Sequence, residues 1–277
     1  MGHDKLRKFA ENETFSCLLQ PSAQELLADG YFHLRDHAVK GHWNERFGNS
    51  NPIVLELGCG KGEYTIALAE RDPERNYIGV DIKGARLWKG AKYATEHALP
   101  NVAFLRTRVE FITAFFSPGE VSEVWLTFSD PQYRSENSRL CSPLFLERYR
   151  SFLKPGGIVH LKTDSRFLHE YARAVCAAND LKVLSCTQDL YNQQVEVQPV
   201  VKEVQTFYEQ LFLEQGYPIT YLSFVIDHEG AYVSPSDPKE FDSKAWRAAE
   251  GPRLLFGHDS AETRRQKLHA APSSLDD

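Results

Sequence analysis

Residues 54–62 read VLELGCGKG and point to one class of fold. A short run that is mostly apolar leads into three closely spaced glycines, and a helical pattern follows from residue 64. A strand, a glycine-rich turn and a helix in this order let a nucleotide-like ligand approach the backbone, because glycine carries no Cβ. The stretch therefore predicts a nucleotide-binding loop in an α/β domain.

The charges around this loop distinguish between ligand classes. Dinucleotide-binding loops carry a third glycine where this chain has Glu63, and a carboxylate there is a poor neighbour for a pyrophosphate. Glu56 precedes the loop and attracts a cation, such as the ammonium and sulfonium groups of S-adenosylmethionine. Asp81, 25 residues after Glu56, suits the ribose hydroxyls of either ligand. Glu56 and Glu63 therefore favour S-adenosylmethionine over NAD.

Outward from the loop, apolar runs alternate with helical stretches, as in a parallel sheet covered on both faces. The expected strands are Ile53–Leu57, Tyr77–Val80, Val102–Leu105, Val121–Phe128, Gly157–Lys162, Leu181–Ser185 and Ile219–Ile226. The expected helices are Tyr64–Glu70, Ala85–His97, Phe111–Phe115, Pro143–Phe152, Ser165–Asn179 and Val201–Gln215, and residues 153–157 are expected to form a turn. The pattern predicts an α/β, Rossmann-like fold with a mostly parallel seven-stranded sheet.

Three parts of the chain differ in pattern. Residues 1–50 mix charges and aromatic residues and are expected to form an N-terminal arm or cap. Residues 51–227 are expected to form the ligand-binding domain. Residues 228–277, rich in Ser, Pro and Asp, are expected to be a flexible or loosely docked tail.

Composition narrows the class of protein further. The five cysteines are scattered without a CxxC pair, which favours reduced thiols in the cytoplasm over a disulfide framework or a zinc site. The charged first residues argue against a signal peptide, and no apolar run has the length of a membrane span. The net charge of −6 argues against a nucleic-acid partner. Local basic patches still allow one, because charge acts over only about 8–10 Å: Lys5, Arg7, Lys8, Lys83, Arg86, Lys89 and Lys92.

At this point the chain resembles the bacterial tRNA (guanine-N7)-methyltransferase family over residues 4–226. The motifs that carry the resemblance are KLRKFAENETF (5–15), ELGCGKG (56–62), YIGVDIK (77–83), FSDP (128–131), KPGG (154–157), KTD (162–164) and TFYE (206–209). The resemblance implies a class I methyltransferase fold, S-adenosylmethionine as methyl donor and no metal. It also implies guanine 46 in the variable loop of tRNA as acceptor, a cytoplasmic location, and neither a membrane nor an obligate protein partner.

The resemblance also implies roles for individual residues. The cofactor-binding residues would be Glu56, Gly58, Gly60, Asp81, Ile82, Arg108, Val109 and Asp130. The residues facing the RNA and the target guanine would be Arg134, Asp164, Thr206 and Glu209. Asp130 and Asp164 would be the catalytic pair.

Methyl transfer to guanine N7 needs these residue types. The N7 atom offers a lone pair and no proton, so no general base is required, and the reaction depends on alignment. A carboxylate stabilises the positive charge that develops on the ring and accepts from guanine N1–H and N2–H₂. Taken singly, each acid also has a structural alternative: Asp130 in a turn, Asp164 at a helix N-terminus, and Glu209 on a solvated helix face.

The chain departs from the family pattern at two places. The family shows Phe-Pro-Asp-Pro-Trp and then a basic segment, whereas residues 129–139 here read SDPQYRSENSR. Arg108 stands where the family carries an acid that meets the adenine amino group, which a guanidinium cannot accept from. Because residues 129–139 lack the family's basic residues, two alternatives stay open. The acceptor could be another RNA or a small molecule, or the chain could be a catalytically weak relative that binds RNA.

Overall fold

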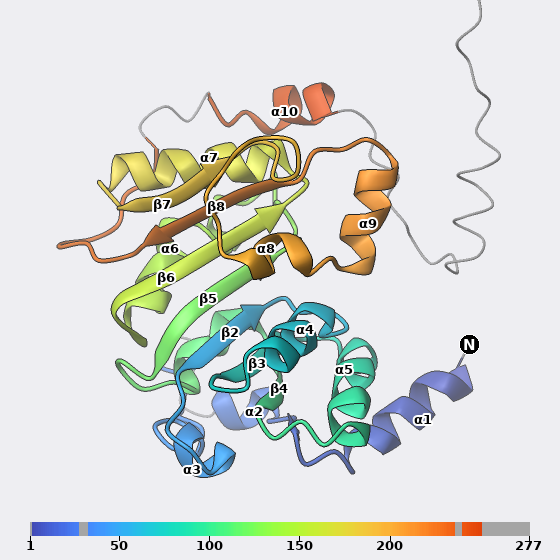
Figure 1. The fold of residues 1–277 in the computed structure, drawn as a ribbon. Helices are drawn as coiled ribbons and strands as arrows, with labels where there is room; N and C mark the ends of the chain where they lie inside the picture. The colour runs from blue at the N-terminus through green and yellow to red at the C-terminus, as the bar shows by residue number, and fades with distance from the viewer. Residues whose placement is uncertain (1, 28–32, 236–239, 251–277) are drawn as a thin grey trace, which may run out of the picture.

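The computed structural model describes residues 2–27, 33–235 and 240–250. Within them the strands form one eight-stranded sheet in the order β1-β4-β3-β2-β5-β6-β8-β7. The strands are β1 (Leu18–Leu19), β2 (Ile53–Leu57), β3 (Asn76–Asp81), β4 (Val102–Arg106), β5 (Val121–Thr127), β6 (Leu153–Thr163), β7 (Val183–Thr187) and β8 (Thr220–Val225). Neighbouring strands run parallel as far as β6, and β8 runs antiparallel between β6 and β7 (Figure 1).

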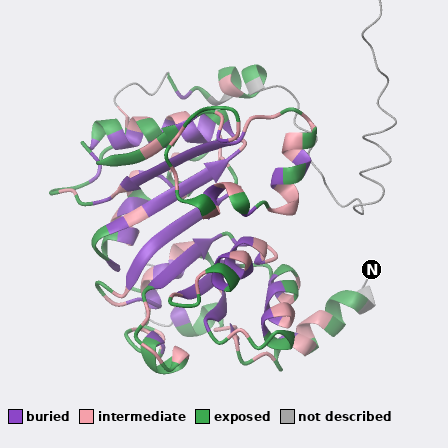
Figure 2. Ribbon diagram, viewed as in Figure 1, coloured by how far each residue is buried: buried purple, intermediate pink, exposed green. Residues whose placement is uncertain are grey.

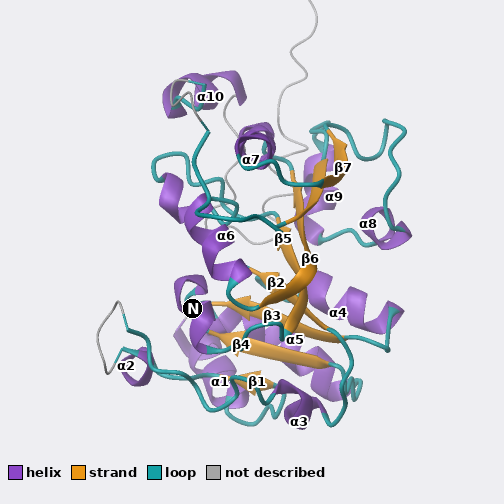
Figure 3. Cartoon of the chain, turned by 90° about the vertical axis from the view of Figure 1, so that its left-hand side faces the viewer, coloured by secondary structure: helices purple, strands orange, loops and turns teal. Residues whose placement is uncertain are grey.

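Helices lie on both faces of this sheet, and each face has its own buried core. The α-helices are α1 (Gly2–Asn12), α2 (Ala23–Leu26), α3 (Trp43–Phe47), α4 (Glu63–Arg71), α5 (Gly84–Glu96), α6 (Pro143–Arg150), α7 (Arg166–Ala178), α8 (Pro199–Glu203), α9 (Phe207–Glu214) and α10 (Ser243–Glu250). Helix α4 lies on one side of the strands and α6 on the other (Figure 3). Tyr64 of α4 and Tyr149 of α6 belong to separate buried clusters. The predicted α/β architecture is confirmed.

Burial explains why the strands could be recognised. All residues of β2, β3 and β5 are buried, as expected for parallel strands covered on both faces (Figure 2). Each of the seven predicted strands is present, with ends that shift by a few residues. The eighth strand, β1, was not predicted. It is only two residues long, and Leu18 pairs with Phe104 at the edge of the sheet.

Three local predictions were wrong. The single helix expected over residues 201–215 is two helices, because Val204 leaves the helix in an extended conformation and Thr206 caps α9. The turn expected at residues 153–157 lies inside β6, where the pairing with β5 shifts register and Gly156 has a φ of 75°. The helix expected at Phe111–Phe115 is a 3-10 helix, η1, over Val109–Ala114.

The two ends of the described chain pack on the domain. In α1, Glu11 accepts a hydrogen bond from the Trp88 indole of α5 at 2.7 Å. In the C-terminal part, the ring of Trp246 lies 5.7 Å from that of Phe167 on α7. Residues 1, 28–32, 236–239 and 251–277 of the predicted arm and tail lie outside the described residues, and the three-part division of the chain stays a prediction.

The described residues contain neither a membrane-spanning helix nor a cluster of metal-binding side chains. None of the helices in this part of the chain is long and apolar enough to cross a membrane. The same residues contain no group of three or more His, Cys, Asp and Glu side chains that could hold a metal ion. Neither result bears on how the sheet positions the predicted site.

Candidate active site

The sheet brings most of the predicted site residues to one edge. Leu57 pairs with Val80, and Thr127 pairs with Lys162, so the residues that follow β2 and β3, or β5 and β6, start at matching heights. In an open α/β sheet, ligands bind outside the carboxyl ends of such strands. The loops after β2, β3, β4, β5 and β6 carry the predicted residues from Gly58 to Asp164.

The three glycines after β2 serve different purposes. Gly58, Gly60 and Gly62 all adopt left-handed φ values, of 81°, 58° and 72°. A Cβ on Gly62 would lie 2.5 Å from the ring of Phe104, so this glycine is required by packing. A Cβ on Gly58 or Gly60 would meet nothing within 4 Å. The loop thus presents bare backbone to open space at these two positions, as a bound ligand requires.

Asp81 is held in place at the end of β3. Its Oδ2 accepts from the amide of Gly60 at 3.0 Å and its Oδ1 from the amide of Lys83 at 2.7 Å. The side chain of the next residue, Ile82, is apolar and yet 54% exposed. A fixed carboxylate beside an exposed apolar side chain suits a ribose with a flat ring attached.

Glu56 lies beneath the loop. It is 4% exposed, and its carboxylate accepts from the Thr65 amide at 2.8 Å and from the hydroxyls of Thr65 and Thr127. Burial raises the pKa of Glu56 to about 7, although these hydrogen bonds oppose the shift. A cation bound near this carboxylate would favour its ionised form.

The loop after β4 carries Arg108 and Val109. The Arg108 guanidinium pairs with Glu110 at 3.1 Å and lies 5.6 Å from the centre of the Phe111 ring. Val109, the first residue of η1, packs partly buried against the core. Burial alone would raise the pKa of Glu110, but the hydrogen bond from Arg108 lowers it.

Asp130 sits in an exposed turn after β5, where its Oδ1 accepts from the Gln132 amide at 2.9 Å. The turn begins with backbone strain, because Phe128 has a left-handed φ of 50°. The Phe128 amide donates to the carbonyl of Lys162 at 2.9 Å, and its ring stacks on Phe212 of α9 at 6.2 Å. Neighbouring segments therefore fix the start of the loop that carries Asp130.

The rest of this loop docks on α7 through Arg139 and Glu136. Arg139 is buried, with its guanidinium 4.7 Å from the ring centre of Phe167 and 4.3 Å from that of Tyr171. The Tyr171 hydroxyl donates to Glu136 at 2.7 Å. Of the two arginines in residues 129–139, only Arg134 is exposed to a partner.

Asp164 and Thr206 stand at helix starts. Asp164 follows β6 and is half-buried, while its neighbour Ser165 caps α7 by accepting from the Leu168 amide at 3.2 Å. The cap is therefore Ser165, and a structural need for a cap does not account for Asp164. Thr206 caps α9 and accepts from the Glu209 amide at 3.2 Å.

Glu209 is buried, so the alternative of a solvated residue on the helix face is wrong. Its side chain is 0% exposed, and its Oε1 lies 2.7 Å from the ammonium of Lys162, which is also 0% exposed. The Tyr191 hydroxyl donates to the same oxygen at 2.5 Å, and Oε2 has no hydrogen-bond partner among the described residues. The predicted contact between Glu209 and guanine stays a prediction. Lys162 was not predicted, since nothing in the sequence links two residues so far apart.

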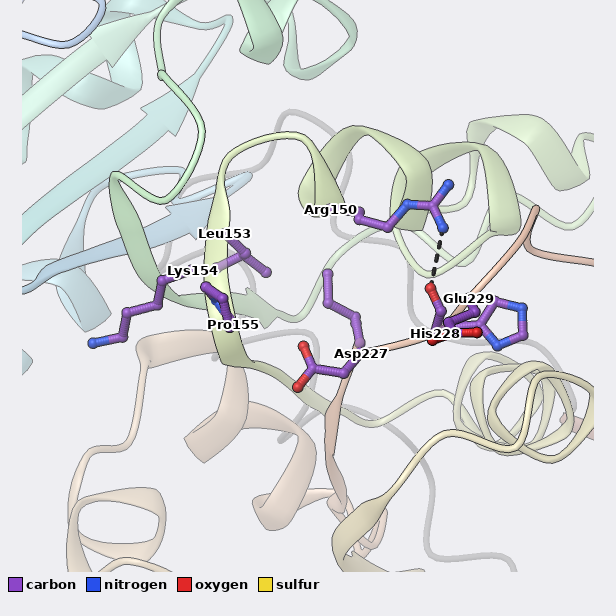
Figure 4. Close-up of a pocket in the computed structure, with 8 residues that line it drawn as sticks. Arg150, Leu153, Lys154, Pro155, Asp227, His228 and Glu229 are labelled. Carbon is purple, nitrogen blue, oxygen red and sulfur yellow. Dashed lines mark hydrogen bonds between the residues drawn. The ribbon is translucent and has the colours of Figure 1, made fainter.

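A cavity of about 490 Å³ lies at the other end of β6, away from these residues. It is lined by Arg150, Leu153, Lys154, Pro155, Ile226, Asp227, His228 and Glu229 (Figure 4). Two of its polar side chains are already engaged: Arg150 donates to the His228 carbonyl at 3.2 Å, and Asp227 accepts from the Gly156 amide at 3.0 Å. None of the predicted site residues lines it, so it carries no part of the site.

Comparison with known proteins agrees with this geometry. Residues 50–222 match the family model Methyltransf_4, described as "Putative methyltransferase". A tRNA (guanine-N(7)-)-methyltransferase of Christiangramia forsetii is 50% identical over 226 residues, which cover 80% of this chain and 98% of that protein. One of Bacteroides thetaiotaomicron is 45% identical over 243 residues, which cover 87% of this chain and 93% of that protein.

A solved structure shows the fold independently of close sequence similarity. The 16S rRNA methyltransferase KamB is 16% identical and aligns with a TM-score of 0.51 over 67% of this chain and 92% of that one. This likeness confirms the predicted methyltransferase fold and says nothing about the acceptor. The close relatives match nearly their whole length, and the family model matches more than half of the chain. The chain therefore belongs to the tRNA (guanine-N7)-methyltransferase family.

Proposed function

We propose that this chain transfers the methyl group of S-adenosylmethionine to N7 of guanine 46 in the variable loop of tRNA. One observation carries the proposal: a backbone turn open at Gly58 and Gly60 lies at the same sheet edge as two acids, Asp130 and Asp164. The named activity of relatives up to 50% identical supports the acceptor. The proposal places the enzyme in the cytoplasm, without a metal or an obligate protein subunit.

The residues at the ends of β2, β3 and β4 fit S-adenosylmethionine. The open backbone at Gly58 and Gly60, above the buried Glu56, would hold the cationic methionine end. Asp81 would accept from the ribose hydroxyls, and the exposed Ile82, with Val109 and Arg108, would contact the adenine. The bound donor supplies a methyl group on a positively charged sulfur, and this chain supplies its position.

The acids that follow β5 and β6 would hold the acceptor in line with that methyl group. Asp164 would accept from guanine N1–H and N2–H₂, a pair of donors that adenine lacks. Asp130 would lie at the junction of donor and acceptor and stabilise the charge that develops on the ring. Thr206 and Arg134 would contact the guanine and the RNA backbone. Because N7 carries no proton, the site needs alignment and no general base.

A basic surface beside this edge supports an RNA partner in spite of the net charge of −6. The Trp88 ring of α5 has three cations within about 5 Å of its centre, Arg7, Lys8 and Lys92. Carboxylates of α1 and α5 offset part of this charge, namely Asp4, Glu11 and Glu96. Lys83, at the start of the same helix, follows Asp81 and Ile82 directly. Such a surface attracts phosphates within a Debye length, independently of the total charge.

The test is methyl transfer itself. The purified chain is incubated with methyl-labelled S-adenosylmethionine and unmodified tRNA, and the digested nucleosides are separated. Labelled 7-methylguanosine from the wild type, and none from Asp164→Ala, is the expected result. Substituting guanine 46 in the transcript should remove the label. Cofactor binding without label in any tRNA would overturn the proposal in favour of another acceptor, and RNA binding without cofactor dependence would favour a non-catalytic relative.

A further inference from the structure

We infer that Glu209 acts on methyl transfer through Lys162, as a positioning residue that locks residues 191–209 over the acceptor side of the site. The inference rests on the proposed function and names how that site is held together. Glu209 belongs to the TFYE motif and Lys162 to the KTD motif. The structure joins these two motifs in one buried ion pair.

Every hydrogen-bond donor of Lys162 is used. Its ammonium contacts Glu209 at 2.7 Å and donates to the carbonyls of Val201 at 2.7 Å and Val204 at 2.9 Å. An ammonium has three donors, so none is left for a ligand or for proton transfer. Val201 lies in α8 and Val204 is the residue at which the chain leaves this helix. Lys162 therefore fixes the end of α8 and the start of the linker to α9.

The segment is tied to the site at further points. The Tyr191 hydroxyl donates to Glu209, and the amide of Phe207, the first residue of α9, donates to Glu63 at 3.0 Å. Glu63 begins α4 immediately after the glycine loop. The cap of α9, Thr206, is thereby fixed between the cofactor loop and the end of β6.

Lys162 also connects this segment to both predicted catalytic acids. It precedes Asp164 by two residues on β6. Its carbonyl accepts from the Phe128 amide, which starts the loop of Asp130. A change in the position of Lys162 is therefore transmitted to both acids at once.

Direct contact between guanine and Glu209 conflicts with this packing. The carboxylate is 0% exposed, Oε1 already accepts from two donors, and Oε2 is buried without a hydrogen-bond partner among the described residues. A base could reach it only if the 191–209 segment moved away, which would break the contacts of Lys162 with Val201 and Val204. The resting geometry thus assigns the acid to the ion pair.

The first experiment is a double-mutant cycle in the full-length chain with Lys162→Gln, Glu209→Gln and both together. Each single variant leaves one buried charge without its partner, whereas the double variant keeps a neutral hydrogen-bonded pair. We expect each single change to lower kcat by about tenfold or more, and the double variant to recover to within about threefold of the wild type. A double variant as impaired as Glu209→Gln alone would show that the carboxylate itself is needed and would overturn the inference.

The second experiment uses the substrate and distinguishes positioning from mere support of the fold. Inosine replaces the target guanosine in tRNA and removes only the 2-amino group. The inosine penalty is the ratio of the rate on guanosine tRNA to the rate on inosine tRNA. If a residue accepts a hydrogen bond from the 2-amino group, its mutation makes this ratio smaller, whereas mutation of a positioning residue leaves the ratio unchanged. We expect Asp164→Asn, which keeps a measurable rate, to shrink the inosine penalty and Glu209→Gln to leave it unchanged. A smaller penalty in Glu209→Gln would overturn the inference.

Failure of the proposed function would look different. If the wild type forms no 7-methylguanosine, the melting temperatures of the variants still test the pair. Each single variant should melt below the wild type, and the double variant should melt above both singles. Three equal melting temperatures would show that the ion pair does not hold the segment, whatever the acceptor is.

Discussion

The carboxylate of Asp81 accepts a hydrogen bond from the amide of Gly60 at 3.0 Å, which ties the end of β3 to the turn after β2. The tie fixes the turn before any ligand binds, because the second oxygen of Asp81 is also held, by the Lys83 amide at 2.7 Å. The cofactor loop is therefore a preformed cradle, and binding requires little ordering of this backbone.

Alanine substitutions at two glycines of the cofactor loop should have different effects, mainly on stability at Gly62 and mainly on cofactor binding at Gly58. Gly62→Ala forces a Cβ to within 2.5 Å of the Phe104 ring and should lower the free energy of unfolding by about 2–4 kcal/mol. Gly58→Ala has open space at the same point and should cost only about 1–2 kcal/mol from its φ of 81°. Its larger effect should be on affinity for S-adenosylmethionine, measured by calorimetry next to thermal melts. An equal loss of stability in both variants would contradict the assignment.

Glu56 should make stability fall as pH rises. Its folded pKa of about 7 is above the ordinary 4.5, so the folded state holds the proton more tightly than the unfolded one. That contribution, about 3 kcal/mol, is complete below pH 4.5 and is lost as pH rises through 7. Melting temperatures between pH 5 and 8 should therefore decline more steeply in the wild type than in Glu56→Gln.

Binding of the cationic donor should release the proton from Glu56. Calorimetry of S-adenosylmethionine binding at neutral pH, in buffers of different ionisation enthalpy, counts the protons released. The wild type should release a measurable fraction of a proton, and Glu56→Gln should release less. Equal counts in the two proteins would mean that the cation does not lie near Glu56.

Substitution by Asn should lower kcat at Asp130 and Asp164 but not at a control acid, Asp180. Asp164→Asn and Asp130→Asn keep an acceptor oxygen, so the turn that Asp130 makes with Gln132 is preserved. Loss of the negative charge should lower kcat on the order of 100-fold, with melting temperature nearly unchanged. Asp180→Asn, exposed at a φ of 50° that Asn tolerates well, should leave kcat unchanged. Full activity in Asp164→Asn would exclude a role for its charge.

A second buried network should govern acid stability. Burial alone would raise the pKa of Glu123, but His160 and Arg75 lower it to about 2. The resulting stabilisation, about 3 kcal/mol, is present above pH 4.5 and is lost as pH falls toward 2. In urea titrations, Glu123→Gln should be less stable than the wild type at pH 7 and similar to it near pH 2.5. A constant difference across this range would contradict the ion pairing.

The central strands were predictable because apolar residues run along nearly their whole length. β2 and β5 are buried along their whole length, and their residues are apolar apart from Glu56 in β2 and Ser122, Glu123 and Thr127 in β5. The glycine loop was predictable for a related reason, since its chemistry lies within a few consecutive residues. Both features are set by neighbouring residues in the chain, so a short stretch of sequence is enough to predict them.

The partners of buried polar groups could not be predicted. Lys162 and Glu209 are 47 positions apart, and each alone resembles a solvated charge in the sequence. Arg75, Glu123 and His160 meet in the same way, from the loop before β3, from β5 and from β6. The split between α8 and α9 also depends on tertiary contacts, because Lys162 binds the carbonyls of Val201 in α8 and of Val204, where the chain leaves that helix. Such pairings follow from topology, which periodicity does not report.

The place of β8 has a consequence for synthesis. β7 is made before β8, yet its sheet pairing is with β8. While the ribosome adds residues 188–219, β7 has no ladder to join, and β6 presents an unpaired edge. A chain that stops before Thr220 would therefore lose two strands and leave a bare edge open to aggregation. The helices α8 and α9, which carry the acceptor-side segment, are thus made while the sheet is incomplete, and their docking completes together with the sheet.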